Sequence, residues 1–479
     1  MLPITQYRIW PLCAILLFLI AMTVVTYVNR FPTGDDAWFA EQSYWLYKEG
    51  IIRSEFFRGI AGWEKGLLVS HKLFLAFGAM LIHWFGYDLP VLKFSGLTFF
   101  VLLIFQLVIY LHQREKRHFY HYLAAVLILA FCNRLLIKMS FENRPEMMVA
   151  AFGFASFLVL NFKKEHRFWI MLSGFLAGLA FLAHMNGVIY VIAGVLALWT
   201  QPGKFGKITA FLFGAAISGS MYLIDILTFE DGLSVWWYQF RNDPATQTSF
   251  HFYPKLIQLL TYPRMFFQSP EQLSLSVLLV YIFYMNRQFI SKLPSFLSRY
   301  AAILVITFWL ISKANAGLYL VLFIPFMLVL AYEMYRLNPV THPAFKWILA
   351  LYFVIGIYGS GQLIHKNRQL GYLPDTYRQL SQKLPKTATG LVPLTFFYND
   401  YVQFTRLLTH ENYKLYCHKE NMSATGLANW AKMNAAQFIV VDYKFNAEPF
   451  FPSQTVTRLP HYERRYYDGR FAVFFMNGK

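Results

Sequence analysis

Residues 73–86 read Leu-Phe-Leu-Ala-Phe-Gly-Ala-Met-Leu-Ile-His-Trp-Phe-Gly, and the length of this run decides how the chain is arranged in a membrane. A membrane-spanning helix needs about 20 apolar residues. The run has only 14 and includes His83, which is typical of a helix that lies at the membrane surface or re-enters it. We therefore expect residues 73–86 not to cross the membrane.

The rest of the chain is dominated by longer apolar runs, which predict a polytopic α-helical membrane protein. Hydrophobic residues make up 57% and charged residues 14% of the chain, against about 45–50% and about 25% in soluble domains. This composition excludes disordered, collagenous and ordinary soluble proteins. About 11 spans are predicted, near 9–28, 89–111, 122–139, 145–162, 168–183, 187–200, 208–228, 272–286, 300–312, 317–335 and 346–363. The first lacks a small-residue cleavage site, so we expect it to be retained.

Basic clusters separate these runs and predict the orientation. If the run 73–86 does not cross, the clusters near residues 114–117, 163–167, 204–207, 287–299 and 336–346 share one side, which the positive-inside tendency makes cytoplasmic. The N-terminus is then cytoplasmic and the C-terminus extracytoplasmic, in the cytoplasmic (inner) membrane. The formal charge of +18 fits loop orientation and contact with anionic lipids, and no nucleic-acid partner is expected.

The chain divides into a transmembrane domain, residues 1–363, and a small extracytoplasmic α/β domain, residues 364–479. The transmembrane domain carries two larger outer loops, 29–88 with surface helices near 36–49 and 71–86, and 229–271, rich in aromatic and polar residues. In the tail we expect strands at 391–398, 438–441 and 471–476, a helix at 424–433, and a hairpin turn at Asp468-Gly469 after a strand at 462–467. No P-loop or dinucleotide fingerprint occurs, and no cytoplasmic loop can hold a nucleotide-binding domain. Direct use of ATP or a nucleotide sugar is therefore not expected.

Two adjacent carboxylates, Asp35 and Asp36, follow the first span directly. Acids at the membrane surface suit a general base or a cation site. The same residues also suit the N-terminus of a helix, where Asp caps the backbone and complements the dipole. The spacing leaves both interpretations open.

Further rare polar residues gather at the same outer level. They are Arg144 and Glu146 at the start of a span, His184 and Asn186 in a short loop, and Lys313. Each has an ordinary explanation, such as a snorkelling lysine or an Arg144–Glu146 ion pair. Such a pair is disfavoured if both residues are helical, because residues two apart do not face each other. Their convergence on one membrane face predicts a site.

Several of these segments resemble the motifs of GT-C class glycosyltransferases, which include lipid A aminoarabinose transferases and protein O-mannosyltransferase relatives. Gly34-Asp35-Asp36-x-x-Phe39-Ala40 resembles their Gly-Asp-Glu/Asp-x-x-Tyr-Ala signature after the first helix. His71-Lys72-Leu73 together with Leu81 to Gly86 resembles the family's segment that begins Lys-Pro-Pro-Leu and ends Leu-Phe-Gly, although the two prolines are absent here. Glu64-Lys65-Gly66 is a second candidate for the position of that lysine. Three later segments also resemble family motifs: Arg144-Pro145-Glu146, Leu182 to Gly187, and Lys313 to Pro325 with Tyr319. Together they cover about residues 8–360.

The resemblance implies inverting transfer of a sugar, hexosyl or pentosyl, from a polyprenyl-phosphate donor to an acceptor lipid, glycan or protein on the outer face of the membrane. It implies Asp35, Asp36 and Glu146 as catalytic residues, with Asp35 as the base, and these three as ligands if a divalent cation takes part. The implied substrate-binding residues are Arg144, Lys72, His71, Lys65, His184, Asn186, Arg241, Lys313 and Tyr319.

Two other classes of membrane protein remain open on the residues alone. A polymerase or ligase of lipid-linked glycans is also polytopic, but it usually carries its basic residues in a large late outer loop and lacks an acidic pair after the first helix. A transporter needs broken helices in two related halves, and the sequence has no such internal symmetry.

Overall fold

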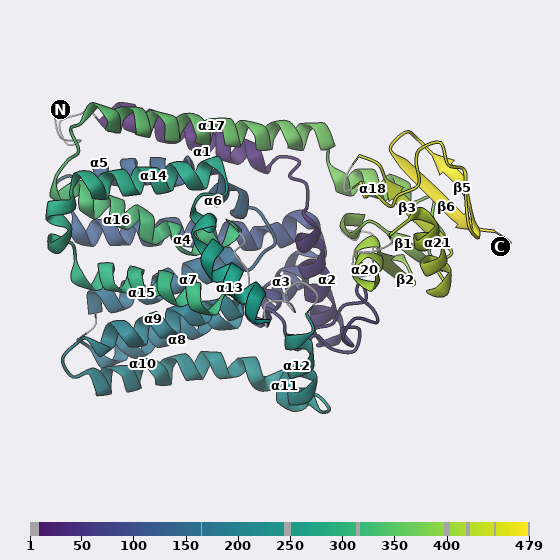
Figure 1. The fold of residues 1–479 in the computed structure, drawn as a ribbon, viewed down its shortest axis with the longest axis horizontal. Coiled ribbons are helices and arrows are strands. Elements are labelled where there is room, and N and C mark those ends of the chain that lie inside the picture. Colours follow the sequence, from purple (N-terminus) through teal and green to yellow (C-terminus); the bar gives the residue numbers. More distant parts are fainter. Residues whose placement is uncertain are drawn as a thin grey trace.

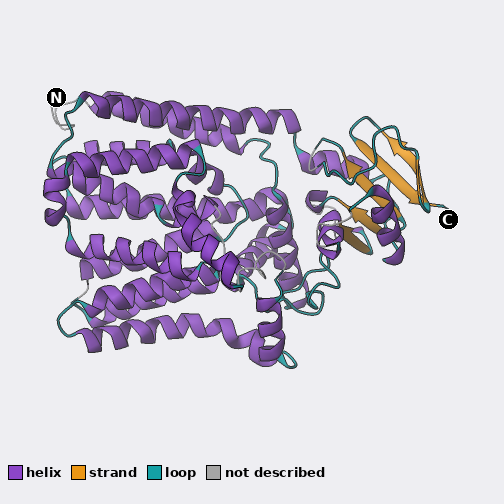
Figure 2. Ribbon diagram, viewed as in Figure 1, coloured by secondary structure: helices purple, strands orange, loops and turns teal. Residues whose placement is uncertain are grey.

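The computed structural model describes residues 9–163, 165–243, 251–312, 317–396, 403–417, 422–444 and 447–477. It contains a bundle of helices that run roughly side by side and a smaller unit with a β-sheet at one end of the bundle (Figure 1). Among the described residues, the bundle consists of helices and their connecting loops, and strands occur only in the end unit (Figure 2). The predicted combination of an apolar helical bundle with a small C-terminal sheet is confirmed.

The helices of the bundle match the apolar runs of the sequence. They are α1 (Ile9–Tyr27), α4 (Leu89–Arg114), α5 (Phe119–Phe131), α6 (Arg134–Met139), α7 (Glu146–Lys163), α8 (Arg167–Ala183), α9 (Val188–Trp199), α10 (Lys204–Gly219), α14 (Pro270–Met285), α15 (Ser295–Ile311), α16 (Ile324–Leu337) and α17 (Pro343–Leu370). The run 122–139 is broken into α5 and α6, because the side chain of Asn133 accepts from the backbone N–H of Leu136 (3.0 Å) and starts a new helix.

Five helical stretches are long and apolar enough to cross a membrane by length and composition: Ile9–Tyr27, Leu89–Arg114, Glu146–Lys163, Lys204–Thr228 and Pro343–Ser381. Shorter apolar helices fill out the bundle, so the number of spans, 11, stays a prediction. Large apolar side chains stand exposed on the outer faces of the bundle, among them Leu17, Val101, Phe213, Val280 and Val354. A surface of this kind suits lipid rather than water.

The predicted basic loops meet one another at one end of the bundle. Arg114 at the end of α4 and Arg336 at the end of α16 both pair with the buried Glu333 (2.8 and 3.0 Å). Lys207 of α10 pairs with Glu165, just before α8 (2.6 Å). Figure 1 shows the start of α1 at this end and the C-terminal unit at the opposite end. This arrangement is the one that the positive-inside argument requires.

The first loop contains the two expected surface helices, α2 (Gly34–Glu49) and α3 (Lys72–Phe85). Both lie at the end of the bundle next to the sheet unit (Figure 1). They touch at Gly78, where a Cβ atom would come within 2.4 Å of the Ser43 hydroxyl. Three more short helices come between α10 and α14 in the chain, α11 (Ile224–Thr228), α12 (Gly232–Arg241) and α13 (Phe252–Thr261).

The C-terminal unit is a mixed sheet with helices α18 (Leu373–Ser381), α20 (His410–Tyr416) and α21 (Ala424–Met433). Its strand order is β2-β1-β3-β6-β5-β4, with β1–β2 and β1–β3 parallel and the other pairs antiparallel. The strands are β1 (Thr389–Val392), β2 (Arg406–Thr409), β3 (Phe438–Asp442), β4 (Arg458–Leu459), β5 (Tyr462–Tyr467) and β6 (Phe471–Met476). Gly469 makes the expected β5–β6 turn with a φ of 88°. The expected strand 391–398 ends at Val392, and 397–398 lie outside the described residues.

The sheet unit is not separated from the bundle at residue 363. Helix α17 continues through residues 363 and 364 to Leu370. One apolar cluster joins the first loop to the unit and contains Phe56 and Trp63 together with Tyr377 and Phe438. The Thr409 hydroxyl also donates to the carbonyl of Phe56 (3.3 Å). The first loop and the sheet unit therefore form one packed body.

Site-specific labelling tests the predicted orientation. In a chain with its three cysteines, Cys13, Cys132 and Cys417, replaced by serine, new cysteines at Glu230 and Lys432 should react with an impermeant maleimide in intact spheroplasts. Cysteines at Lys116 and Gly203 should react only after permeabilisation. All four positions are exposed, so access to the reagent reports sidedness alone. Labelling of position 116 in intact spheroplasts contradicts the orientation.

Candidate functional site

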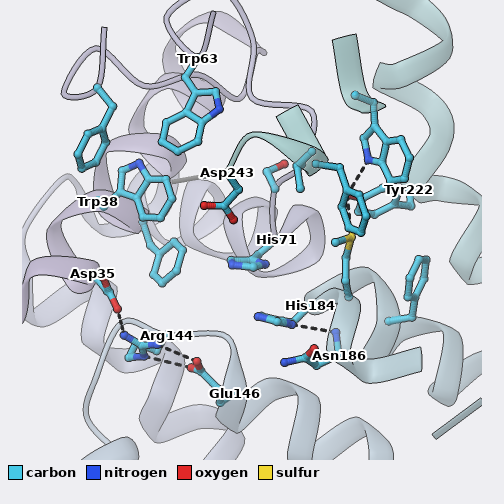
Figure 3. Close-up of a pocket in the computed structure, with 18 of the residues that line it drawn as sticks. Asp35, Trp38, Trp63, His71, Arg144, Glu146, His184, Asn186, Tyr222 and Asp243 are labelled. Carbon is cyan, nitrogen blue, oxygen red and sulfur yellow. Dashed lines mark hydrogen bonds and ion pairs between the residues drawn. The ribbon is translucent and has the colours of Figure 1, made fainter. Parts of the chain in front are cut away.

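A cavity of about 1050 Å³ opens where the bundle, the first loop and the sheet unit meet (Figure 3). Four parts of the chain line it. The first loop contributes Asp35, Trp38, Phe57, Trp63, Ser70 and His71, and the bundle contributes Arg144, Glu146, His184, Asn186 and Tyr319. The segment around α11 and α12 contributes Tyr222, Ile226, Trp236 and Asp243, and the sheet unit contributes Leu394, Glu411, Lys414 and Leu415.

The adjacent acids Asp35 and Asp36 have different surroundings. Helix α2 begins with a capping box, in which the Thr33 hydroxyl accepts from the N–H of Asp36 (3.4 Å) and the Asp36 carboxylate accepts from the N–H of Thr33 (2.6 Å). The Asp36 side chain is fully buried, and the Asp35 side chain is 54% exposed. Consecutive helix residues point about 100° apart, so only Asp35 reaches the cavity.

Asp36 is held by a buried network outside the cavity. Its second carboxylate oxygen accepts from the backbone N–H of Asn143 (2.6 Å), and the Asn143 amide donates back to the Asp36 carbonyl (3.0 Å). The buried ammonium of Lys93 lies 3.6 Å from the carboxylate. The resemblance groups Asp36 with Asp35 as a catalytic residue, but Asp36 does not line the cavity, because its oxygens are turned toward these partners.

Arg144 connects two carboxylates at the cavity wall. Its Nε and Nη2 donate to the two oxygens of Glu146 (3.2 and 2.8 Å), and its Nη1 donates to Asp35. The expectation that Arg144 and Glu146 face each other poorly is wrong. Helix α7 begins at Glu146, so Arg144 lies before the helix and the spacing rule for helical neighbours does not apply. The result is a fork-shaped pair that leaves one edge of the guanidinium for Asp35.

Two histidines stack across the cavity. The rings of His71 and His184 lie 4.3 Å apart and are inclined by 13° (Figure 3). The backbone N–H of Asn186 donates to His184 Nδ1 (2.9 Å), so the neutral ring carries its proton on Nε2. The Tyr319 ring meets His184 edge-on at 6.0 Å. Burial lowers the pKa of His71, helped by His184 and Arg144, and burial lowers the pKa of His184 to about 4. The pair is therefore neutral at physiological pH.

The other predicted cations that the structure describes, Lys72, Lys65 and Arg241, do not line the cavity. The ammonium of Lys72 pairs with Asp225 and lies 4.5 Å from the centre of the Tyr222 ring. Lys65 is exposed. Arg241 is exposed and lies over the Trp237 ring (5.9 Å). Lys313 lies outside the described residues. Among the described residues the structure therefore brings together Asp35, Arg144, Glu146, His71, His184, Asn186 and Tyr319.

Several cavity residues were not predicted from the sequence. Glu411 and Lys414 come from α20 in the tail, where the sequence has no motif that marks them. Trp63 and Phe57 lie in the first loop, whose aromatic content was the one available signal. No group of three His, Cys, Asp or Glu side chains with an arrangement suited to a metal ion occurs in the described part of the chain.

No protein-family model and no curated protein sequence matches this chain. Solved structures do. ArnT from Cupriavidus metallidurans, bound to undecaprenyl phosphate, aligns with a TM-score of 0.58 at 14% identity, covering 96% of this chain and 97% of that one. The oligosaccharyltransferase AglB from Archaeoglobus fulgidus, in complex with an inhibitory peptide and a dolichol-phosphate, gives a TM-score of 0.52 at 11% identity, covering 90% and 69%. The chain has the GT-C membrane fold that these structures share, as its motifs predict.

The two acids should differ in their effect on stability. Asp36→Ala removes a buried partner of Lys93 and two short backbone hydrogen bonds, so it should destabilise the protein by about 3–5 kcal/mol. Asp35→Ala removes a half-exposed ion pair and should cost no more than about 1 kcal/mol. Thermal unfolding of both variants in lipid nanodiscs measures the difference. Equal losses in the two variants contradict the burial argument.

The stacked histidines should make stability depend on pH. Histidines of the unfolded chain take up protons near pH 6.5, whereas His184 resists protonation down to about 4. Between these values the unfolded state binds more protons, so the free energy of unfolding should fall as the pH is lowered, by about 1.4 kcal/mol per pH unit for each such histidine.

Melting temperatures between pH 7 and pH 4 measure this slope. Replacing His71 and His184 by glutamine should flatten it, and the same change at the exposed His83 should not. Some slope should remain, because burial lowers the pKa of His410 in the sheet unit to about 3. An unchanged slope in the double variant contradicts the assignment.

Proposed function

We propose that this chain transfers a sugar from a polyprenyl-phosphate donor to an acceptor hydroxyl at the outer surface of the cytoplasmic membrane, with inversion at the anomeric carbon. One observation carries the proposal: the half-exposed carboxylate of Asp35 lies in a large cavity at the end of an apolar bundle and contacts the Arg144 guanidinium. A base and a cation at one point of a membrane-surface cavity are the two groups that such a displacement requires.

The proposed chemistry follows from these two residues. Asp35 accepts the proton of the acceptor hydroxyl while its oxygen attacks the anomeric carbon. The bond between that carbon and the phosphate oxygen breaks, and the polyprenyl phosphate leaves with the electron pair. Arg144 lies where it can stabilise the developing negative charge on the phosphate. Glu146, with 3% of its side chain exposed, fixes the guanidinium by two hydrogen bonds.

The ion pair also suggests an order of binding. Nε and Nη2 of Arg144 donate to Glu146, so Nη1 is the nitrogen left for other partners, and it donates to Asp35. A donor phosphate that approaches Arg144 competes with Asp35 for this position. Release from the guanidinium leaves the carboxylate free to accept a hydrogen bond from the acceptor hydroxyl. Donor binding would thus prepare Asp35 for the acceptor.

The two sides of the cavity fit the two parts of a lipid-linked donor. Charged and polar side chains gather around Arg144. The lining also includes five large apolar side chains, here called the apolar side: Phe181, Leu223, Ile226, Leu233 and Ile311. The apolar side suits a prenyl chain and the polar side its phosphate and sugar. The shared fold with ArnT, whose structure holds undecaprenyl phosphate, supports this assignment. The acceptor, a glycan, lipid or protein, reaches the cavity from the same outer face.

Asp35→Asn should abolish transfer. Asparagine keeps the size of the side chain and its capacity to cap a helix, but it cannot take a proton, and loss of a general base typically lowers the rate by about 10²–10⁴. The assay measures sugar transfer by the purified protein in nanodiscs, with polyprenyl-phosphate sugars and acceptor extracted from membranes.

A matched control is Asp375→Asn. The Asp375 side chain is 58% exposed and pairs with Arg378, so it resembles Asp35 in exposure and partner but lies outside the cavity. This variant should retain normal transfer. Asp35→Asn should still bind undecaprenyl phosphate, which separates loss of chemistry from loss of folding. Normal turnover in Asp35→Asn would refute the catalytic role.

A further inference from the structure

Three cations that do not line the cavity gather where α6 meets the last turns of α17. They are Arg134 and Lys138 of α6 and Lys366 of α17, and we call them the α6–α17 cluster. This part of α17 points to the sheet unit (Figure 1), whereas the basic loops meet at the opposite end of the bundle. The charge pattern that orients the chain therefore does not explain these cations. Arg134 and Lys138 also interrupt the apolar run 122–139, where ionisable side chains are rare unless they have a function.

The cluster forms because the two helices pack side by side. Nη1 of Arg134 donates to Oε1 of Gln362 in α17 (3.1 Å) and to Oε1 of Glu271 in α14 (3.1 Å). Residues four apart lie on the same face of a helix, so Lys138 follows Arg134 in the same way as Lys366 follows Gln362. The charges of Lys138 and Arg134 both act on Lys366. Two lysines from different helices are therefore brought near each other.

Hydrogen bonds to backbone carbonyls hold both lysines in place. The buried guanidinium of Arg30, which follows α1, donates to the carbonyl of Lys138 (2.8 Å). The amide of Asn367, the residue after Lys366, donates to the carbonyl of Thr26 in α1 (2.7 Å). The end of α1 thus fixes α6 and α17 together. Like charges held near each other repel, so this arrangement favours the binding of an anion.

The nearby carboxylates do not neutralise the two lysines. Lys366 forms no ion pair with a described carboxylate, and its ammonium lies over the Phe31 ring at 4.4 Å. The Lys138 ammonium lies 3.9 Å from Glu142, too far for a hydrogen bond. The charges of two further cations, Arg30 and Lys93, act on the same Glu142 carboxylate. Because 44% of the Lys138 side chain is exposed and Lys366 is exposed, both ammonium groups can take an external partner.

The lysines lie where the exposed surface of α17 changes from apolar to polar. Its exposed side chains include Leu351, Val354 and Tyr358, and then Gln362 and Lys366. On a helix that crosses a membrane, such a change marks the level at which the hydrocarbon gives way to the lipid headgroups. Phospholipid phosphates lie at this level, so a lipid that packs against α17 places its headgroup beside the cluster.

We propose that Lys138 and Lys366 bind the headgroup phosphate of an anionic phospholipid, in the leaflet on the side of the sheet unit. Each ammonium offers up to three N–H donors and a full positive charge, which suits phosphate oxygens. A headgroup with a net negative charge fits two lysines, whereas the amine of a zwitterionic headgroup is repelled by them. The polyprenyl phosphate proposed for the cavity does not account for the cluster, because these residues lie outside the cavity. The lipid site is thus independent of the proposed sugar transfer.

The test measures which phospholipid stays bound to the protein. The protein is released from nanodiscs that contain equal amounts of phosphatidylglycerol and phosphatidylethanolamine with the same acyl chains, and native mass spectrometry identifies the retained lipid. The wild type should retain phosphatidylglycerol in preference. Lys366→Gln and Lys138→Gln should each lower this preference about 5-fold, the contribution of one lysine near a membrane surface.

The matched control is Arg368→Gln. Arg368 is an exposed cation on the same helix, but two residues beyond Lys366 it points about 200° away around the helix axis. This variant should keep the wild-type preference. Lys366→Gln removes no ion pair with a described carboxylate, so its melting temperature should stay unchanged and its lipid preference decides the outcome if Lys138→Gln, which leaves Glu142 with one cation fewer, folds poorly.

Three results overturn the proposal: no preference for phosphatidylglycerol in the wild type, an unchanged preference in Lys366→Gln, or an equal loss in Arg368→Gln, which would reflect surface charge alone. A fourth is displacement of the retained phosphatidylglycerol by an equal amount of undecaprenyl phosphate in the wild type but not in Lys366→Gln. That result would make the polyprenyl carrier the occupant of the cluster.

Discussion

The buried carboxylate of Asp36 is the constraint on which the site depends. It accepts hydrogen bonds from Thr33 in its own capping box and from Asn143 before α7, and it is 3.6 Å from the ammonium of Lys93 in α4. Three segments far apart in the sequence thereby meet at one anion. A charge buried this deeply is tolerated only when hydrogen bonds and an opposite charge surround it, so the positions of these segments are closely coupled.

The position of Asp35 follows from that network. Once Asp36 fixes the first turn of α2, the preceding residue must face away from the network and into the cavity. Asn143 is hydrogen-bonded to Asp36, so the next residue, Arg144, lies beside the first turn of α2. There its guanidinium donates to both Asp35 and Glu146. The two adjacent acids therefore have different surroundings. Asp36 is buried and paired, which stabilises the fold, whereas Asp35 stays half exposed in the cavity.

The sheet unit completes the cavity rather than standing apart from it. Phe56 and Trp63 of the first loop pack in one cluster with Tyr377 and Phe438 of the unit. Glu411 and Lys414 pair with each other (3.2 Å) at the cavity lining. Any change that loosens this packing alters the part of the cavity wall that carries Trp63.

The sequence by itself determined the apolar bundle, the end of the bundle where the basic loops meet, the surface helices α2 and α3, and most of the C-terminal strands, because hydrophobic periodicity and charge placement act locally along the chain. It also indicated Asp35, Arg144, Glu146 and His184 from their level at the membrane edge.

Only the tertiary structure decided which of the two acids lines the cavity. It also decided that Arg144, which lies before α7, forms an ion pair with Glu146, and that Lys72 forms an ion pair with Asp225. It also brought Trp63 and Lys414 to the site. These outcomes depend on burial and on partners more than 100 residues apart, such as Asp36 with Asn143 and Lys72 with Asp225. The pattern along a single chain does not specify contacts between segments so far apart, because they form only when the whole bundle packs.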